Sequence, residues 1–229
     1  MILSKKFNPK ELLTVKISKG APRIKINALS FACEARNLVS ANMFLSYIAS
    51  NPGSIDIHES NELPFCTACL LGDLNFLESL LKLESNSGPI NIHINNELPF
   101  ALACKHGHLQ IILKLLDLES THGKINIHVG DDAPFQMSLE SNHSLISIKL
   151  ISMQHTHGLI GKDKIREWLQ SEVDMDAVEE SFKDHDYKGS KACLSPVIDV
   201  CGNQEIKNRL AKFIAGKAAK EMMAVSKPR

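Results

Sequence analysis

The sequence predicts an all-α repeat solenoid, in which pairs of helices stack one on another. Three observations support this fold class: one segment recurs three times, apolar residues follow each copy with the spacing of a helix face, and Gly or Asn stands where those helices would end. The period is 35 residues, the spacing of Gly53, Gly88 and Gly123. Repeats of this length are typical of stacked helical units that bury a continuous core between neighbours.

Each copy of the repeat begins with an Ile-x-Ile tripeptide, which has the alternation of a short strand. A polar turn and then Pro-Phe follow it. The tripeptides are residues 55–57, 90–92 and 125–127, and the prolines are Pro64, Pro99 and Pro134. We expect each proline to begin a first helix, because proline at the first helical position loses no intrahelical hydrogen bond.

The first helix of the unit is predicted to end at a glycine. Phe100, Ala103 and Cys104 fall on one face, and Gly107 follows. Gly72 and Asn142 stand in the same register, and both residue types favour the left-handed conformation that ends helices. A second helix is then predicted from apolar residues at helical spacing. These residues are Ile111, Ile112, Leu115 and Leu116, matched one repeat earlier by Phe76, Leu77, Leu80 and Leu81.

The run from Leu98 to Leu109 resembles the ankyrin pattern of Thr-Pro-Leu-His, paired small residues and Gly-His-Leu. The resemblance covers about residues 24–154 and implies about four ankyrin repeats with short hairpin turns. The first repeat, Ala28 to Ile48, is degenerate, because Arg36 replaces the capping glycine. The chain departs from the family where ankyrins usually have a capping Thr: Leu63, Leu98 and Ala133 stand there.

The ankyrin resemblance implies a module that binds another protein on a concave face. The family's variable contact positions fall, in this numbering, on Leu70, Leu71, Lys105, His106, Glu140 and Ser141, and its turn contacts on Glu59, Asn61, Ile94, Asn95, Asp131 and Asp132. The irregular repeats and diverged ends also resemble ankyrin proteins that intracellular bacteria or large viruses deliver into host cells. The resemblance therefore implies an effector acting on host proteins, located in the host cytosol after secretion.

Two segments flank the repeats. Residues 1–23 form a basic N-terminal segment, and residues 155–229 are predicted to form a helical extension. Within the extension, residues 155–164 resemble a loop, two short helices follow, and Trp168 is expected to dock them on the last clear repeat. The stretch from Pro196 to Cys201 keeps the spacing of Pro99 to Cys104, so it is either a degenerate capping repeat or a helix unrelated to the repeat.

Composition limits the classes of function. Of the 229 residues, 44% are hydrophobic and 23% charged, and the 26 basic and 26 acidic side chains cancel. This balance argues against a nucleic-acid partner. No apolar stretch approaches the roughly 18 to 20 residues that span a bilayer, and the N-terminus lacks the apolar core of a secretion signal. We therefore expect a cytoplasmic protein without membrane insertion.

The cysteines and histidines are predicted to be structural. The six cysteines are expected to be free thiols, since no signal peptide precedes them. Cys66 and Cys69 have the spacing of a zinc or redox pair, but no second pair lies nearby. His58, His93 and His128 recur with the repeat, and we expect each to hydrogen-bond the hairpin of its neighbour rather than share a metal.

One cluster outside the repeats offers an alternative. It consists of His155, His157, Asp184, His185, Asp186, Cys193 and Cys201. These residue types could assemble a Cys-His hydrolase or a metal site, so the second hypothesis is a repeat scaffold that presents a catalytic C-terminal region. A self-associating structural protein is the third. Because the spacing matches no known motif, we predict a protein-protein interaction module that is not an enzyme and has no cofactor or metal.

Overall fold

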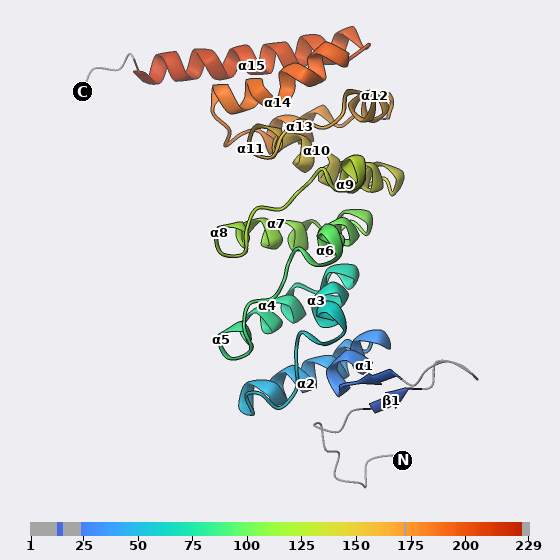
Figure 1. The fold of residues 1–229 in the computed structure, drawn as a ribbon. Coiled ribbons are helices and arrows are strands. Elements are labelled where there is room, and N and C mark those ends of the chain that lie inside the picture. The colour runs from blue at the N-terminus through green and yellow to red at the C-terminus, as the bar shows by residue number, and fades with distance from the viewer. Residues whose placement is uncertain (1–12, 16–23, 172, 226–229) are drawn as a thin grey trace. The chain divides into compact units, whose positions relative to one another are not determined.

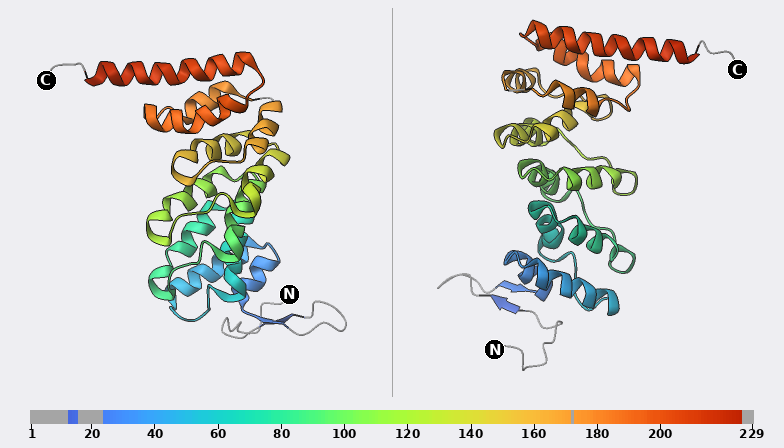
Figure 2. Two further views of the ribbon diagram at one scale, coloured as in Figure 1. Left: turned by 45° about the horizontal axis from the view of Figure 1, so that its top comes forward. Right: turned by 180° about the vertical axis from the view of Figure 1, so that it is seen from behind.

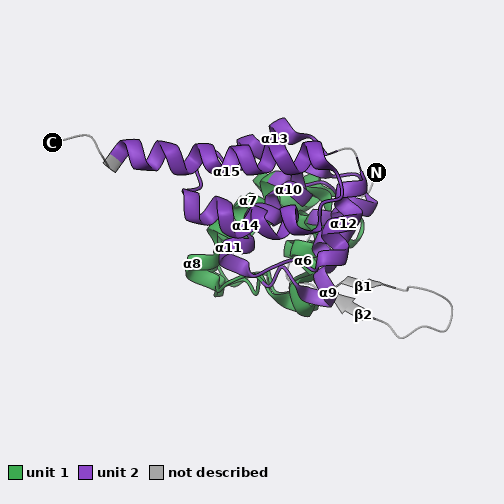
Figure 3. Ribbon diagram, turned by 90° about the horizontal axis from the view of Figure 1, so that it is seen from above, with its two compact units in different colours: residues 1–103, 110–125 green, residues 104–109, 126–229 purple. Residues whose placement is uncertain are grey.

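The structure is a computed structural model, and it describes residues 13–15, 24–171 and 173–225 (Figures 1 and 2). The chain divides into two compact units (Figure 3). Unit 1 consists of residues 1–103 and 110–125, and unit 2 of residues 104–109 and 126–229. The boundary predicted at residue 154 thus lies inside unit 2. Of the basic segment 1–23, only Leu13–Val15 is among the described residues.

Unit 1 is built from helix pairs, and these confirm the predicted all-α class. Strands β1 (Leu13–Val15) and β2 (Ile24–Ile26) form a small antiparallel pair before the helices. The helices that follow are α1 (Ala28–Glu34), α2 (Leu38–Ser50), α3 (Glu59–Leu71), α4 (Leu74–Leu81), α5 (Glu84–Ser87), α6 (Ile94–Lys105), α7 (Leu109–Asp117) and α8 (Glu119–His122). Helix α1 packs on α2 and α3, and α4 packs on α2 and α3. Phe65, Phe76 and Phe100 are completely buried in this core.

Unit 2 continues with one more repeat and then four further helices. Its helices are α9 (Val129–Glu140), α10 (Ser144–Ser152), α11 (Gln154–His157), α12 (Lys162–Gln170), α13 (Met175–Ser181), α14 (Tyr187–Val200) and α15 (Gln204–Val225). Helix α10 contacts α9, α11, α13 and α14, while α12 packs on α9 and α14. The apolar face of α10 is thereby covered, and Ile146, Leu150 and Ile151 are buried. No helix in the described ranges is long and apolar enough to cross a membrane.

The predicted helix ends are confirmed. Gly72, Gly107 and Asn142 have positive φ values of 73°, 81° and 58°, as a left-handed helix cap requires. Arg36, which replaces the glycine in the first repeat, adopts the same conformation with a φ of 51°. The second helix α4 begins at a polar cap. The side chain of Asp73 accepts a hydrogen bond from the Phe76 N–H.

The turn before each first helix differs from the hairpin that the ankyrin resemblance implied. Residues 55–57 and their equivalents form no strand, although both isoleucines of each tripeptide are buried. Three consecutive residues then adopt left-handed helical geometry: Ser60–Glu62, Asn95–Glu97 and Gly130–Asp132. Such geometry costs about 1–2 kcal/mol for each ordinary residue, so contacts outside the turn must hold it. The right-handed helix begins just after it, at Pro64 and its equivalents.

The repeat extends further than the sequence analysis predicted. Helices α5, α8 and α11 are equivalent, and each ends at a glycine with a positive φ: Gly88, Gly123 and Gly158. The residue that begins α11, Gln154, accepts a hydrogen bond from the Ile160 N–H, as Glu84 does from the Ile90 N–H. The prediction of a loop over residues 155–164 was therefore wrong. The repeated Thr-His-Gly at 121–123 and 156–158 was the overlooked signal.

The proposed register of a capping repeat at Pro196 is also wrong. Pro196 lies inside α14, whereas Pro99 stands where the right-handed part of α6 begins. Helices α14 and α15 still form an antiparallel pair, in which Glu221 near the end of α15 accepts a hydrogen bond from the Tyr187 N–H at the start of α14. The two short helices predicted after residue 164 correspond to α12 and α13.

Candidate protein-binding surface

Histidine links join successive repeats, and they determine how the turns are held. In the first link, His58 Nδ1 lies 2.9 Å from the Glu62 carboxylate, and His58 Nε2 lies 3.0 Å from the carbonyl oxygen of Ser87. The second link joins His93 to Glu97 and to the His122 carbonyl, and the third joins His128 to Asp132 and to the His157 carbonyl. Each His was predicted to hydrogen-bond the hairpin of its neighbour; the bond to the neighbouring repeat is confirmed, but its acceptor is the last residue of a short helix, α5, α8 or α11, and not a hairpin.

Donor counting favours the charged form of His58 and His93. Both ring nitrogens face oxygen acceptors, and only the imidazolium carries two N–H donors. Burial alone would lower the pKa of His58, but the hydrogen bond and the charge of Glu62 outweigh it and raise the pKa above its usual value. The same causes, with Glu97 in place of Glu62, raise the pKa of His93.

The carboxylate of the link also holds the left-handed turn. Glu62 is buried and accepts a 3.0 Å hydrogen bond from the Asn91 N–H of the next repeat. Asp132 is equivalent and accepts a 2.8 Å bond from the Gly161 N–H. Asp132 is only 6% exposed, so its assignment as a partner contact is wrong. Its two oxygens are engaged within unit 2, and a partner would have to break both bonds to reach it.

In unit 1 the predicted contact residues are not equally accessible. Asn61 and Asn95 lie exposed in the left-handed turns. Glu59 and Ile94 are half-buried, and Glu59 accepts a hydrogen bond from the Asn27 N–H. Leu70 and Leu71, at the end of α3, are also half-buried. Asn61 and Asn95 are therefore the accessible part of this set.

In unit 2 the predicted contact residues form a polar and charged surface. Lys105, His106 and Glu140 are exposed, and Ser141 is half-buried. Asp131 is exposed and lies 3.6 Å from the ammonium group of Lys164. These side chains follow buried framework residues, since Cys104 and Ser138 have no exposed surface. The framework thus fixes the positions of side chains that contribute nothing to the core.

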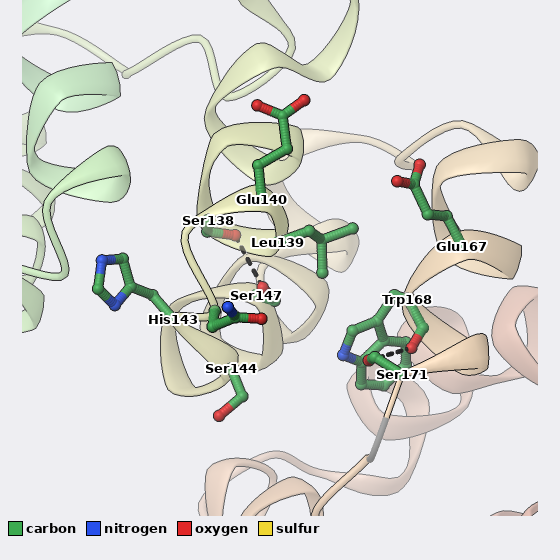
Figure 4. Close-up of a pocket in the computed structure, with 10 residues that line it drawn as sticks. Ser138, Leu139, Glu140, His143, Ser144, Ser147, Glu167, Trp168 and Ser171 are labelled. Atoms are coloured by element: carbon green, nitrogen blue, oxygen red, sulfur yellow. Dashed lines mark hydrogen bonds between the residues drawn. The ribbon is translucent and has the colours of Figure 1, made fainter.

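A pocket of about 350 Å³ opens in unit 2 beside this surface (Figure 4). Helices α9 and α10 form one side, and α12 and the residue after it form the other. Its lining residues are Ser138, Leu139, Glu140, Asn142, His143, Ser144, Ser147, Glu167, Trp168 and Ser171. The Ser138 and Ser147 hydroxyls bond each other at 2.7 Å, and the Ser171 hydroxyl bonds the Trp168 carbonyl at 2.6 Å. The sequence analysis identified Glu140 but missed the rest, because α12 is not part of the repeat.

The alternative catalytic cluster comes together only in part. Cys193 Sγ lies 3.5 Å from His155 Nδ1, and the rings of His155 and His185 meet edge to face at 4.9 Å. Cys193 is completely buried, and burial raises the pKa of its thiol to about 11. The nucleophile in cysteine catalysis is the thiolate, so this thiol is in the wrong state at neutral pH.

Two other members of that cluster, Asp186 and Cys201, have separate structural roles. Asp186 caps α14 through the Gly189 N–H, and the Cys201 thiol donates to the Asn203 carbonyl. All six cysteines are free, and burial raises the pKa of Cys66 to about 11 and that of Cys69 well above its usual value. Within the described ranges, no group of three or more His, Cys, Asp and Glu residues is placed to hold a metal ion.

Comparisons with known proteins gave no match: no family model, no curated protein and no solved structure is similar to this chain.

Proposed function

We propose that the chain is a protein-binding repeat module of the ankyrin kind, which binds its partner through exposed side chains of unit 2. The observation that carries the proposal is a contrast between framework and surface. Positions that build the core keep their residue type from repeat to repeat, as the buried Phe65, Phe100 and Phe135 do, although the small pair Ala68-Cys69 and Ala103-Cys104 becomes Ser138-Leu139 in the third repeat. The following pair changes from Leu70-Leu71 to Lys105-His106 to Glu140-Ser141.

This contrast fits binding better than catalysis. A repeat framework tolerates any side chain at positions that face solvent, so those positions are available for a partner. Catalysis needs an activated group, and the strongest candidate, Cys193, is a buried thiol with a raised pKa. An effector that acts on host proteins would use the same surface.

The test starts with affinity purification from the cytosol of a candidate host cell, followed by binding measurements with each purified partner. The variant is Lys105→Glu with His106→Glu, both exposed side chains. The control, Lys188→Glu with Ala211→Glu, makes the same change in charge on exposed positions of α14 and α15. We expect the variant to bind about tenfold more weakly or worse, with an unchanged melting temperature, and the control to bind normally. Equal binding by all three proteins would contradict the proposal.

A further inference from the structure

The pocket of unit 2 contains a hydrogen-bond donor for which the described part of the chain offers no acceptor. Trp168 is only 3% exposed, and its indole N–H has no hydrogen-bond partner among the residues that the structure describes. In Figure 4 the indole nitrogen faces the side of the pocket where His143 and Ser144 lie. The indole nitrogen is not itself fully buried, so its N–H opens on the space of the pocket and is available to donate to a ligand.

The rim of the same pocket has an excess of negative charge. Glu140 and Glu167 are both exposed, and they stand on opposite sides, on α9 and α12 (Figure 4). Glu140 accepts one hydrogen bond, from Gln136, while Glu167 forms no ion pair with any described residue. No lysine or arginine lines the pocket, and His143 is its one other titratable side chain. A ligand that enters between these carboxylates is therefore favoured if it is a cation.

We propose that this pocket takes a basic side chain, lysine or arginine, from an extended segment of the partner protein. The ammonium or guanidinium group lies between Glu140 and Glu167, and a backbone carbonyl of the same segment accepts from the Trp168 N–H. A basic residue within a peptide supplies both a cation for the two carboxylates and an acceptor for the Trp168 N–H. The volume of about 350 Å³ is near the lower limit for ligand pockets, roughly 300 Å³, and suits one side chain.

Three of the four serine hydroxyls that line the pocket are already bonded, and Ser144 is the exposed fourth. Ser138 and Ser147 are completely buried and already bond each other, and Ser171 is bonded to the backbone of Trp168. The proposal deepens the proposed function, on which it rests, by naming the chemistry of one contact. It does not involve Lys105 or His106, so the two can be tested independently.

The single tryptophan of the chain makes the experiment direct. The full-length protein is titrated with acetylated, amidated tetrapeptides that differ at one position, which is arginine, lysine, norleucine or glutamate. The indole ¹H–¹⁵N signal of Trp168 reports binding at the pocket. We expect that signal to shift saturably with the arginine or lysine peptide, and the affinity to exceed that for norleucine about five- to tenfold. Equal affinity for the norleucine or glutamate peptide, or an indole signal that does not move, would overturn the proposal.

Two variants give a second measurement. Glu140→Gln with Glu167→Gln keeps the shape of the rim, and we expect it to abolish the preference for the basic peptides. The control, Asp199→Asn with Glu205→Gln, removes two exposed carboxylates elsewhere in unit 2 and should retain the preference. An unchanged preference in the first variant would refute the role of the rim. If the basic peptides fail to bind while Lys105→Glu with His106→Glu still loses the partner, the pocket chemistry is wrong and the proposed function stands.

Discussion

The histidine links of the repeats and the His155–His185–Cys193 cluster use the same side chain in opposite ways. In the links, both ring nitrogens face oxygen acceptors, and the buried carboxylate stabilises the charged ring. In the cluster, His185 Nε2 lies 3.0 Å from the Ser152 carbonyl, while its buried Nδ1 has no partner among the residues whose structure is described. Burial lowers the pKa of His185, despite the hydrogen bond to Ser152. The acceptors around a histidine, and not its burial alone, decide its charge.

Helix α11 connects the two regions within unit 2. The carbonyl of His157 accepts from His128 of the third link, and His155, two residues earlier, belongs to the cluster. A structural histidine and a histidine beside a thiol therefore share one four-residue helix. The approach of Cys193 on α14 to His155 on α11 does not make a catalytic site, because burial keeps the thiol protonated.

The largest expected effect breaks the third link by a change in the backbone. Gly158 has φ 104° and ψ 168°, a region that essentially only glycine adopts, and a Cβ there would lie 2.9 Å from His128 Nε2. We expect Gly158→Ala to lower the free energy of unfolding by about 2–4 kcal/mol. Gly88→Ala is the control. Gly88 has nearly the same backbone angles as Gly158, with φ 95° and ψ 164°, but no atom lies within 4 Å of a Cβ placed there. Urea titrations in which the control costs as much would show that contact with His128 is unimportant.

A smaller loss is expected when the acceptor of the first link is removed. Glu62→Leu leaves the His58 imidazolium and the Asn91 N–H without their acceptor, at a cost of about 2–3 kcal/mol. Glu34→Leu, at an exposed position of α1, should change the free energy of unfolding by less than about 0.5 kcal/mol. If the two variants have the same free energy of unfolding, the first link contributes little to stability.

The pH dependence of stability should have opposite signs in the two regions. The pKa values of His58 and His93 are raised in the folded protein, so their contribution is complete below about pH 6.5, the unfolded value, and is lost as the pH rises through the folded values. The pKa of His185 is lowered, so its contribution is complete above about pH 6.5 and is lost as the pH falls. Both contributions are measured as the difference in free energy of unfolding between the unchanged protein and each variant, from pH 5.5 to 8.5. The variants are His58→Gln with His93→Gln, and His185→Gln. If these two differences changed with pH in the same direction, the comparison would be refuted.

The smallest effect concerns reactivity and not stability. With pKa values of about 11, the thiols of Cys66 and Cys193 should be alkylated at pH 7.5 roughly a hundredfold more slowly than a free cysteine. Cys66 should react before Cys193, because it is half-buried and Cys193 has no exposed surface. Mass spectrometry after timed iodoacetamide exposure measures both rates. Rapid labelling of Cys193 would restore the catalytic alternative.

Periodicity predicted the parts of the fold that depend on local sequence. The helix ends at Gly72, Gly107 and Asn142 follow from residue type, and the buried faces follow from apolar spacing. The left-handed turns could not be predicted in this way, since Ser60 and Glu62 do not favour positive φ. Hydrogen bonds of Glu62 with His58 and with the Asn91 N–H hold that conformation. Asn91 lies 29 residues after Glu62 in the sequence.

The candidate site was predictable only where it lies on the repeat. Register identified Lys105, His106 and Glu140 as exposed positions. It failed for Asp132, because the buried role of that carboxylate depends on Gly161 in the following segment. It also missed the pocket, in which Glu167 and Trp168 come from a helix without a repeated counterpart. Contacts between a repeat and a unique segment leave no periodic signal.

The histidine links also impose an order on folding during synthesis. In each link the carbonyl acceptor lies 29 residues after the histidine, as the Ser87 carbonyl does after His58. A newly made repeat therefore cannot complete its turn until the loop of the next repeat has left the ribosome. The same local spacing lets the chain fold progressively from its N-terminus without waiting for distant segments. The last link, between His128 and His157, closes when α11 is available, and the unique helices then cover α10.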